Sequence, residues 1–131
     1  MNQEPKTKAL LLENDQTVLE KIQQALKDRP YELTCFSKKK ETLNALKETF
    51  FNLVITGHNA EGEDPIQVMK AMVMTSPMTS IIMVTDLSHE EAEEKAEGFG
   101  ILGNVSRDVP SGDLLSLMDT YEKIQQSLTQ G

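Results

Sequence analysis

The strongest fold signal in the sequence is a regular alternation of short apolar runs with segments of helical periodicity. Near-continuous apolar runs are typical of strands that are buried on both faces of a parallel sheet. The runs are Ala9–Leu12, Tyr31–Phe36, Leu53–Ile55, Ile81–Val84 and, more weakly, Ile101–Val105. Strands that alternate with helices in this way predict an α/β fold with a doubly wound five-stranded parallel sheet, (βα)5. Residues 1–131 are interpreted as a single domain with a core over about residues 8–128.

The segments between these runs carry apolar residues at spacings of three and four, the period of an amphipathic helix. The stripes are Val18, Leu19, Ile22 and Leu26; Leu43, Leu46 and Phe50; Ile66, Met69 and Met72; and Leu114, Leu117, Met118, Tyr121, Ile124 and Leu128. Helix-start signals agree with this pattern. Asp15 is a candidate N-cap, and Ser88 with Glu91 is a candidate capping box. Pro110 suits a first helical turn.

Residues 88–98 form the least typical of the predicted helices. Its apolar stripe is only Ala92, Ala96 and Phe99. The remaining positions are crowded by glutamates, namely Glu90, Glu91, Glu93, Glu94 and Glu97. A solvated acidic face is the simpler interpretation. A docking face for a basic partner is the alternative.

Length and charge limit the classes of function. The chain has 131 residues and a net charge of −8, so it repels phosphate backbones and we expect no nucleic-acid binding. No apolar stretch is long enough for a membrane span or a signal peptide, and we expect no membrane attachment and a cytoplasmic location. The one cysteine, Cys35, lies in an apolar run and is expected to be a buried, inert thiol.

In doubly wound folds ligands bind beyond the carboxyl ends of the strands, so the residues after each apolar run form the candidate site. The first of these loops is Glu13–Asp15, which is acidic and lacks the glycines of a phosphate-binding loop. His58 and His89 are too isolated to indicate a zinc site. No nucleophilic serine elbow is present. We therefore expect no enzymatic activity.

Four segments at these strand ends form a familiar pattern. They are Leu10–Asp15, Asn52–Gly57, Ile81–Thr85 and Val105–Arg107, with Gly62–Pro65 in the loop after the second. Over about residues 8–128 the chain resembles the receiver domain of bacterial two-component response regulators, a flavodoxin-like (CheY-like) module that accepts a phosphoryl group on an aspartate. The resemblance implies a signalling module of a two-component or phosphorelay system.

The resemblance also places the family's phosphorylation pocket in this sequence, at Glu13, Asn14, Asp15, Gly57, Thr85 and Arg107. Gly57 stands at the position of the acceptor aspartate and has no side chain to phosphorylate. Asn14 replaces a metal-binding carboxylate, so we expect no cofactor and no Mg²⁺ site. Arg107 replaces the family's lysine, and Thr85 alone is unaltered. We interpret the chain as a degenerate pseudo-receiver that acts independently of phosphorylation.

Arg107 allows two interpretations. Its guanidinium can reach into the vacated pocket and pair with Glu13 or Asp15, which would lock one conformation. Alternatively, it points to solvent with its stem packed against the surface. A partly exposed pair would add on the order of 0–1 kcal/mol to the free energy of unfolding.

Docking is the function that these features favour, with a protein partner of the pathway or with an attached output domain. The resemblance implies a docking face that includes Glu90, Glu94, Glu97 and Asn104, and a homodimer through this face is one arrangement. Met69, Met72, Met74 and Met78 are either core residues or an adaptable contact patch.

Two alternatives remain open from the sequence. The first is a receiver that is phosphorylated at a displaced carboxylate, with Asp64, Asp86 and Asp15 as candidates. The second is a flavodoxin-like domain that binds a small ligand in a pocket opened at Gly57. Its candidate lining residues are Thr56, His58, Asn59 and Thr85.

Overall fold

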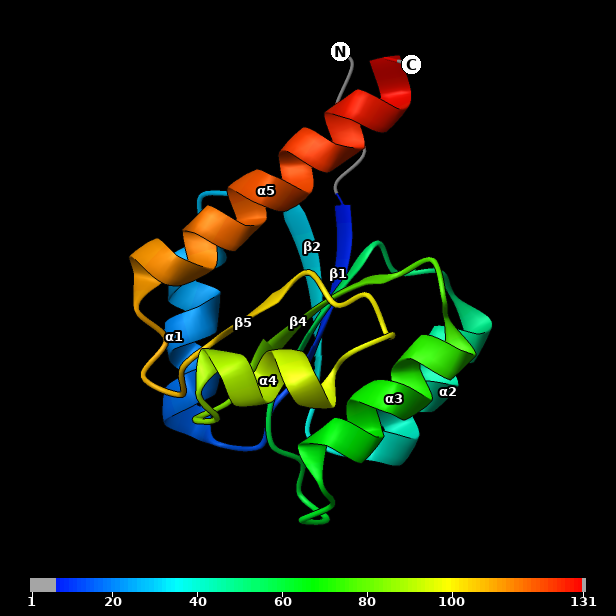
Figure 1. Ribbon diagram of the computed structural model, residues 1–131, viewed down its shortest axis with the longest axis vertical. Helices are drawn as coiled ribbons and strands as arrows, with labels where there is room; N and C mark the ends of the chain where they lie inside the picture. Colours follow the sequence, from blue (N-terminus) through cyan, green and yellow to red (C-terminus); the bar gives the residue numbers. More distant parts are fainter. Residues whose placement is uncertain (1–6, 131) are drawn as a thin grey trace.

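The predicted doubly wound sheet is confirmed in the computed structural model, which describes residues 7–130 and their side chains through Leu128 (Figure 1). In chain order the elements are β1 Thr7–Leu12, α1 Gln16–Leu26, β2 Tyr31–Phe36, α2 Lys39–Glu48, β3 Leu53–Thr56, α3 Pro65–Thr75, β4 Ser80–Val84, α4 His89–Lys95, β5 Gly103–Val105 and α5 Ser111–Gln130. All strand pairs are parallel, in the order β2-β1-β3-β4-β5. The reversal of strand order at β1 puts a topological switch point beside β3.

Each face of the sheet carries its own hydrophobic core. Ala9 and Leu11 of β1 face α1 and α5, whereas Leu10 and Leu12 face α2, α3 and α4. All four side chains are fully buried, because helices cover both faces. This is why β1 is a continuous apolar run and does not alternate with polar residues.

The predicted helix starts at Asp15 and Ser88 are confirmed. Asp15 Oδ1 accepts hydrogen bonds from the backbone N–H groups of Thr17 and Val18, at 2.9 and 3.1 Å. Ser88 and Glu91 form both hydrogen bonds of a capping box. The fourth helix and the fifth strand are shorter than the sequence predicts, since α4 ends at Lys95 and β5 begins at Gly103. Gly98 and Gly100 have φ values of +86° and +66°, and these left-handed turns end the helix early and delay β5 to Gly103.

The expectation of a buried cysteine is wrong, because Cys35 is exposed. It lies on β2, which is an edge strand of the sheet and is only partly covered. The amide of Gln23 donates to Cys35 Sγ at 3.6 Å. The methionines divide: Met69 and Met72 are core residues of α3, while Met74 and Met78 are exposed.

A polar cluster fixes the middle of α5 to the start of β2. The Arg29 guanidinium pairs with Glu122 at 2.8 Å and with Asp119 at 3.0 Å, and the Tyr31 hydroxyl donates to Glu122 at 2.7 Å. The cluster therefore sets the direction in which α5 leaves the body of the domain (Figure 1).

None of the described helices, α5 included, has the length and apolarity needed to cross a bilayer.

This cluster predicts a stability change at alkaline pH. Burial, with the hydrogen bond to Glu122, raises the pKa of Tyr31 well above its ordinary value. The folded state therefore favours the neutral phenol, and this contribution is complete below the unfolded pKa of about 10 and is lost as the pH rises above it. We expect the free energy of unfolding to fall above about pH 10, and to fall less steeply in Tyr31→Phe. Burial also raises the pKa of Tyr121, so part of the slope remains. Urea denaturation across this pH range measures both slopes, and equal slopes would contradict the assignment.

Candidate functional site

The candidate site lies where β1, β3, β4 and β5 end at the same edge of the sheet. Leu12 pairs with Thr56 in the β1–β3 register, so Glu13 and Gly57 are the next residues of neighbouring strands. The Gly57 N–H donates to the Leu12 carbonyl at 2.8 Å, and the Asn14 N–H donates to the His58 carbonyl at 3.0 Å. These bonds extend the pairing of the two chains past the strand ends.

A buried ion pair between Glu13 and Arg107 occupies the centre of this site. Arg107 Nη1 donates to Glu13 Oε1 at 2.6 Å, and Nη2 donates to Oε2 at 2.9 Å. The Glu13 side chain is fully buried, and that of Arg107 is 11% exposed. Of the two interpretations of Arg107, the structure therefore supports the one in which the guanidinium reaches inward. The contact is bidentate, and its side chains are more buried than those of the partly exposed pair considered from the sequence.

The Glu13 carboxylate is also held by two backbone groups. Its Oε2 accepts from the Asp15 N–H at 2.9 Å, and its Oε1 accepts from the His58 N–H at 3.3 Å. With the two bonds from Arg107, the carboxylate has four donors. Glu13 thus ties together the loops that follow β1, β3 and β5.

The space in front of Gly57 is filled by this ion pair. Gly57 is buried, and a Cβ at this position would lie 2.7 Å from Arg107 Nη1 and still closer to Glu13 Oε1. The backbone of Gly57 does not have the positive φ that requires glycine. What excludes a side chain here is the position of the two charged groups. The small-ligand alternative needs a cavity in front of Gly57, but the side chains of Glu13 and Arg107 fill that space.

The loop that carries Arg107 is fixed by further contacts. The Arg107 N–H donates to Asp86 Oδ1 at 3.1 Å, and Lys21 Nζ donates to the Asp108 carbonyl at 3.3 Å. Val109 is buried with a φ of +47°, an unusual conformation for a β-branched residue. Sequence patterns carry no signal for these contacts, since they depend on how the β5–α5 loop is folded. Thr85 is buried nearby, and its hydroxyl accepts from the Leu87 N–H at 3.2 Å.

The three candidate displaced carboxylates all make hydrogen bonds to backbone N–H groups. Asp15 caps α1, Asp64 caps α3 by accepting from Ile66 N–H at 3.0 Å, and Asp86 accepts from Arg107. Among the described residues, no group of three His, Cys, Asp or Glu side chains could hold a metal ion. Asn14 and His58 are exposed at the edge of the site.

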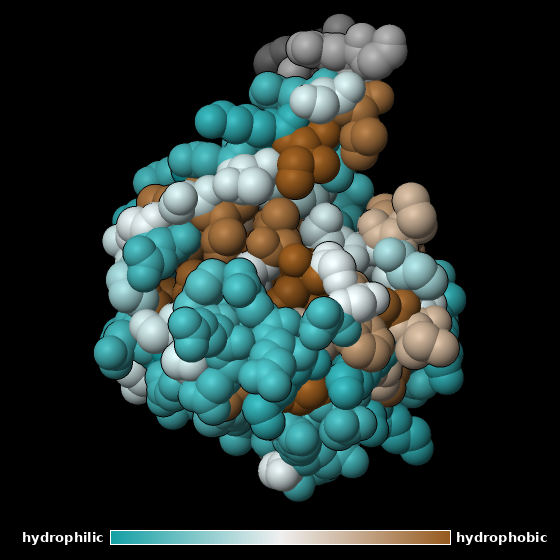
Figure 2. Space-filling model, in the orientation of Figure 1, coloured by the Kyte–Doolittle hydropathy of each residue, from teal (hydrophilic) through white to brown (hydrophobic). Residues whose placement is uncertain are grey.

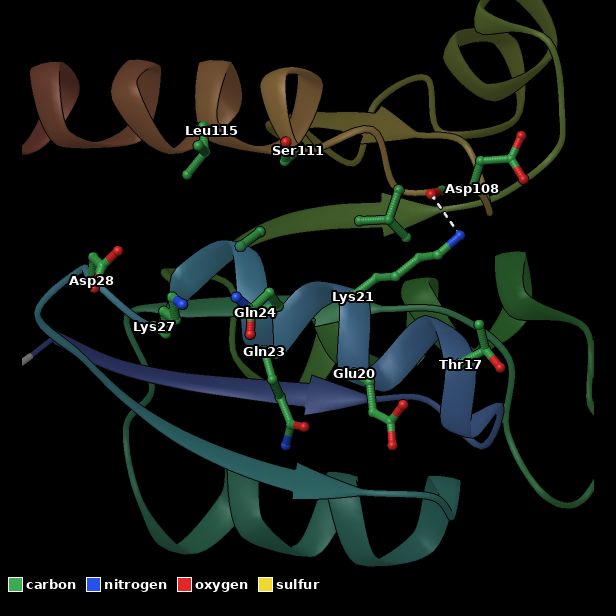
Figure 3. Close-up of a pocket in the computed structure, with 12 residues that line it drawn as sticks. Thr17, Glu20, Lys21, Gln23, Gln24, Lys27, Asp28, Asp108, Ser111 and Leu115 are labelled. Atoms are coloured by element: carbon green, nitrogen blue, oxygen red, sulfur yellow. Dashed lines mark hydrogen bonds between the residues drawn. The ribbon is translucent and has the colours of Figure 1, made fainter.

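The surface hollow next to the site lies beside the ion pair and does not include it. An open groove of about 1170 Å³ runs between α1 and the start of α5, and Lys21 crosses it to reach the Asp108 carbonyl (Figure 3). Its apolar floor includes Ala25, Val109 and Leu115. Neither Glu13 nor Arg107 lines this groove.

The predicted docking residues lie away from the ion pair, on α4 and β5. Glu90, Glu94 and Glu97 are exposed, and Asn104 is half-buried. Asn104 lines a crevice of about 220 Å³ with His89 and Glu93, which pair with each other at 3.0 Å. The exposed acidic face is therefore separate from the buried ion pair.

A (βα)5 fold with a polar site at the carboxyl ends of β1, β3 and β5 defines the flavodoxin-like class of α/β domains. The sequence profile of the response regulator receiver domain matches residues 9–119, and the chain belongs to this family. No curated protein sequence matches the chain.

Solved structures agree in fold. The signal receiver domain of an HD domain-containing protein from Pseudomonas fluorescens Pf-5 is 21% identical, with a TM-score of 0.81 over 99% of this chain and 96% of that one. A CheY-like receiver domain protein from Methanospirillum hungatei JF-1 is 21% identical, with a TM-score of 0.78 over 96% and 99%. Chemotaxis protein CheY4 of Vibrio cholerae is 19% identical, with a TM-score of 0.76 over 88% and 98%.

Proposed function

We propose that this chain is a receiver domain that signals without phosphorylation, as a pseudo-receiver, by docking a protein partner or by positioning an output domain. The observation that carries the proposal is the pair of charged groups in front of Gly57. Glu13 and Arg107 fill the space into which an acceptor side chain would project. The charges neutralise each other in the same place where a phosphorylated receiver would add a phosphoryl group and a metal ion.

Phosphorylation at a displaced carboxylate is the competing function. Asp15, Asp64 and Asp86 each use a side-chain oxygen to accept a backbone N–H, in a helix cap or in the Arg107 loop. Transfer to any of them would need charge stabilisation of the transferred group by a metal or by cations. The cation at the strand ends, Arg107, is already engaged by Glu13. The geometry therefore favours a receiver without phosphoryl transfer.

Docking needs a surface that is held in one conformation. The ion pair connects the ends of β1, β3 and β5, and Asp86 extends this connection to the loop after β4. The loops that border α4 and α5 are therefore braced from inside the domain. A braced surface suits a partner that recognises the domain in a single state, because no conformational cost is added on binding.

The proposal is tested by exposing the chain to acetyl phosphate and Mg²⁺ and recording its intact mass. We expect no phosphoryl adduct on the wild-type chain. The comparator is the triple variant Asn14→Asp, Gly57→Asp and Arg107→Lys, which restores the family's acidic pair, acceptor and lysine. We expect this variant, once its folding is verified by circular dichroism, to gain one phosphoryl group. An adduct on the wild-type chain that is lost in Asp15→Asn, Asp64→Asn or Asp86→Asn would refute the proposal and identify the acceptor.

A further inference from the structure

The outer surface of the α2–α3–α4 layer has an ordered distribution of charge. These three helices share one face of the sheet, since residues of α2 and α3 and Ala96 at the end of α4 pack into the same core with Leu10 and Leu12. Helix α2 leads from β2 to β3, α3 from β3 to β4, and α4 from β4 to β5. With the strand order β2-β1-β3-β4-β5, α3 therefore lies between α2 and α4.

The centre of this layer is apolar. Met74 of α3 is 77% exposed, and Met78 in the following loop is 83% exposed. They are the two most exposed large hydrophobic side chains among the described residues. Figure 2 shows light-brown side chains over the C-terminal half of α3, beside the teal surface of α4. Methionine is a flexible side chain that adapts to a contact surface.

One flank of this apolar centre is basic. Lys40 and Lys47 of α2 are exposed and make no ion pair within the part of the chain that the structure describes. They line a hollow of about 470 Å³ together with Leu43, Asn44, Lys39, Glu61 and Glu63. Lys39 pairs with Glu63 at 3.4 Å, so Lys40 and Lys47 are the lysines left unpaired there.

The other flank is acidic. Ala92 and Ala96 of the α4 segment are buried, so Glu90 and Glu94 project outward. Neither glutamate has an ion-pair partner among the described side chains. The layer thus has unpaired lysines on one side, two exposed methionines in the middle and unpaired glutamates on the other side. Glu61 and Glu63 also lie on the lysine side, and Lys70 of α3 lies over the Phe99 ring.

We propose that this face is a two-fold interface between two copies of this chain. A two-fold axis that runs along α3 places α2 of each copy opposite α4 of the other. The lysines then face the partner's glutamates at both edges, and the methionines of both copies meet at the axis. An apolar centre with a polar rim is the usual anatomy of a protein interface, and self-complementarity is what a two-fold contact requires.

The inference goes beyond the proposed function because it uses none of the residues around Gly57. The net charge of −8 opposes association of two copies at long range. The facing flanks are complementary at short range, so the dimer depends on local charge pairing and on burial of the methionines. Salt screens both the pairing and the long-range repulsion, so all variants are compared at the same ionic strength.

Sedimentation velocity at low salt, over a range of concentrations, tests the interface. We expect the wild-type chain to form a reversible dimer. Lys40→Glu with Lys47→Glu places glutamates opposite Glu90 and Glu94, and Glu90→Lys with Glu94→Lys places lysines opposite Lys40 and Lys47, so each double variant is expected to lose the dimer. An equimolar mixture of the two is expected to recover it as a heterodimer, since acidic flanks then face basic flanks at both edges. Met74→Ser with Met78→Ser is expected to weaken the wild-type dimer by about tenfold or more.

The matched control is Lys27→Glu with Lys123→Glu, which makes the same change in net charge on exposed positions outside the α2–α3–α4 layer. This variant is expected to keep the dimer. The proposal is overturned by a wild-type chain that stays monomeric at every concentration. It is equally overturned by a dimer that survives both charge reversals, by a mixture that fails to associate, or by loss of the dimer in the control. Circular dichroism verifies that each variant is folded.

Discussion

Replacing Arg107 with methionine is expected to lower the free energy of unfolding by about 3–5 kcal/mol. The variant keeps the length of the side chain and removes the charge. The Glu13 carboxylate, whose side chain is fully buried, then loses two of its four hydrogen-bond donors. Burying a charge without a counter-charge costs much more free energy than the intact pair contributes, because the desolvation of the charge is no longer offset. Urea denaturation followed by circular dichroism measures the change.

Arg29 provides the matched control for this substitution. Arg29 pairs with two carboxylates where Arg107 pairs with one, but its side chain is 24% exposed and those of Asp119 and Glu122 are 58% and 40% exposed. Solvent screens such a pair, so Arg29→Met is expected to cost no more than about 1 kcal/mol. Adding Glu13→Gln to Arg107→Met removes the uncompensated charge and is expected to recover part of the loss. Equal costs at Arg107 and Arg29 would show that the strand-end pair is not buried in solution.

Replacing Gly57 with alanine is expected to destabilise the fold by about 1–3 kcal/mol. A single methyl group at this position meets the Glu13 carboxylate and comes within 2.7 Å of Arg107 Nη1. Both groups sit at the ends of side chains, but each is held by the other, and Glu13 is further held by two backbone N–H groups. The methyl group can enter only if the ion pair shifts. The expected result is a lower urea midpoint with an unchanged m-value.

Gly112→Ala is the control for this substitution. Gly112 lies in the first turn of α5 and is exposed, and a Cβ there would meet no atom within 4 Å apart from its chain neighbours and its own helix backbone. Alanine is a better helix former than glycine, so this variant is expected to gain up to about 1 kcal/mol. A Gly57→Ala chain as stable as the wild type would mean that the space in front of Gly57 is open.

Most of the fold could be predicted because its signals are local. Continuous apolar runs such as Leu10–Leu12 indicate strands covered on both faces, and the caps at Asp15 and Ser88 mark helix starts. The expectation of a buried Cys35 fails because it rests on the apolar run, whereas the exposure of Cys35 depends on β2 being an edge strand. Strand order is a property of the whole chain and has no local signal.

The site could be predicted as a set of residues, but not as a set of contacts. Parallel strands end at one edge, so Glu13, Gly57, Thr85 and Arg107 had to lie near each other. Whether Arg107 turned inward depended on the β5–α5 loop, where Val109 has a positive φ and Asp86 accepts from the Arg107 N–H. Neither contact follows from periodicity or from residue type.

The central claim is that Glu13 and Arg107 take the place of a phosphorylatable acceptor, and one titration tests it most directly. Amide NMR spectra of the wild-type chain are recorded with Mg²⁺ and then with beryllofluoride, which mimics a phosphoryl group on aspartate. We predict that the signals of residues 13–15, 56–59 and 85 stay where they are. Signals in these segments that shift and saturate on addition of beryllofluoride would contradict this claim, because they would show a carboxylate that still accepts the phosphoryl mimic.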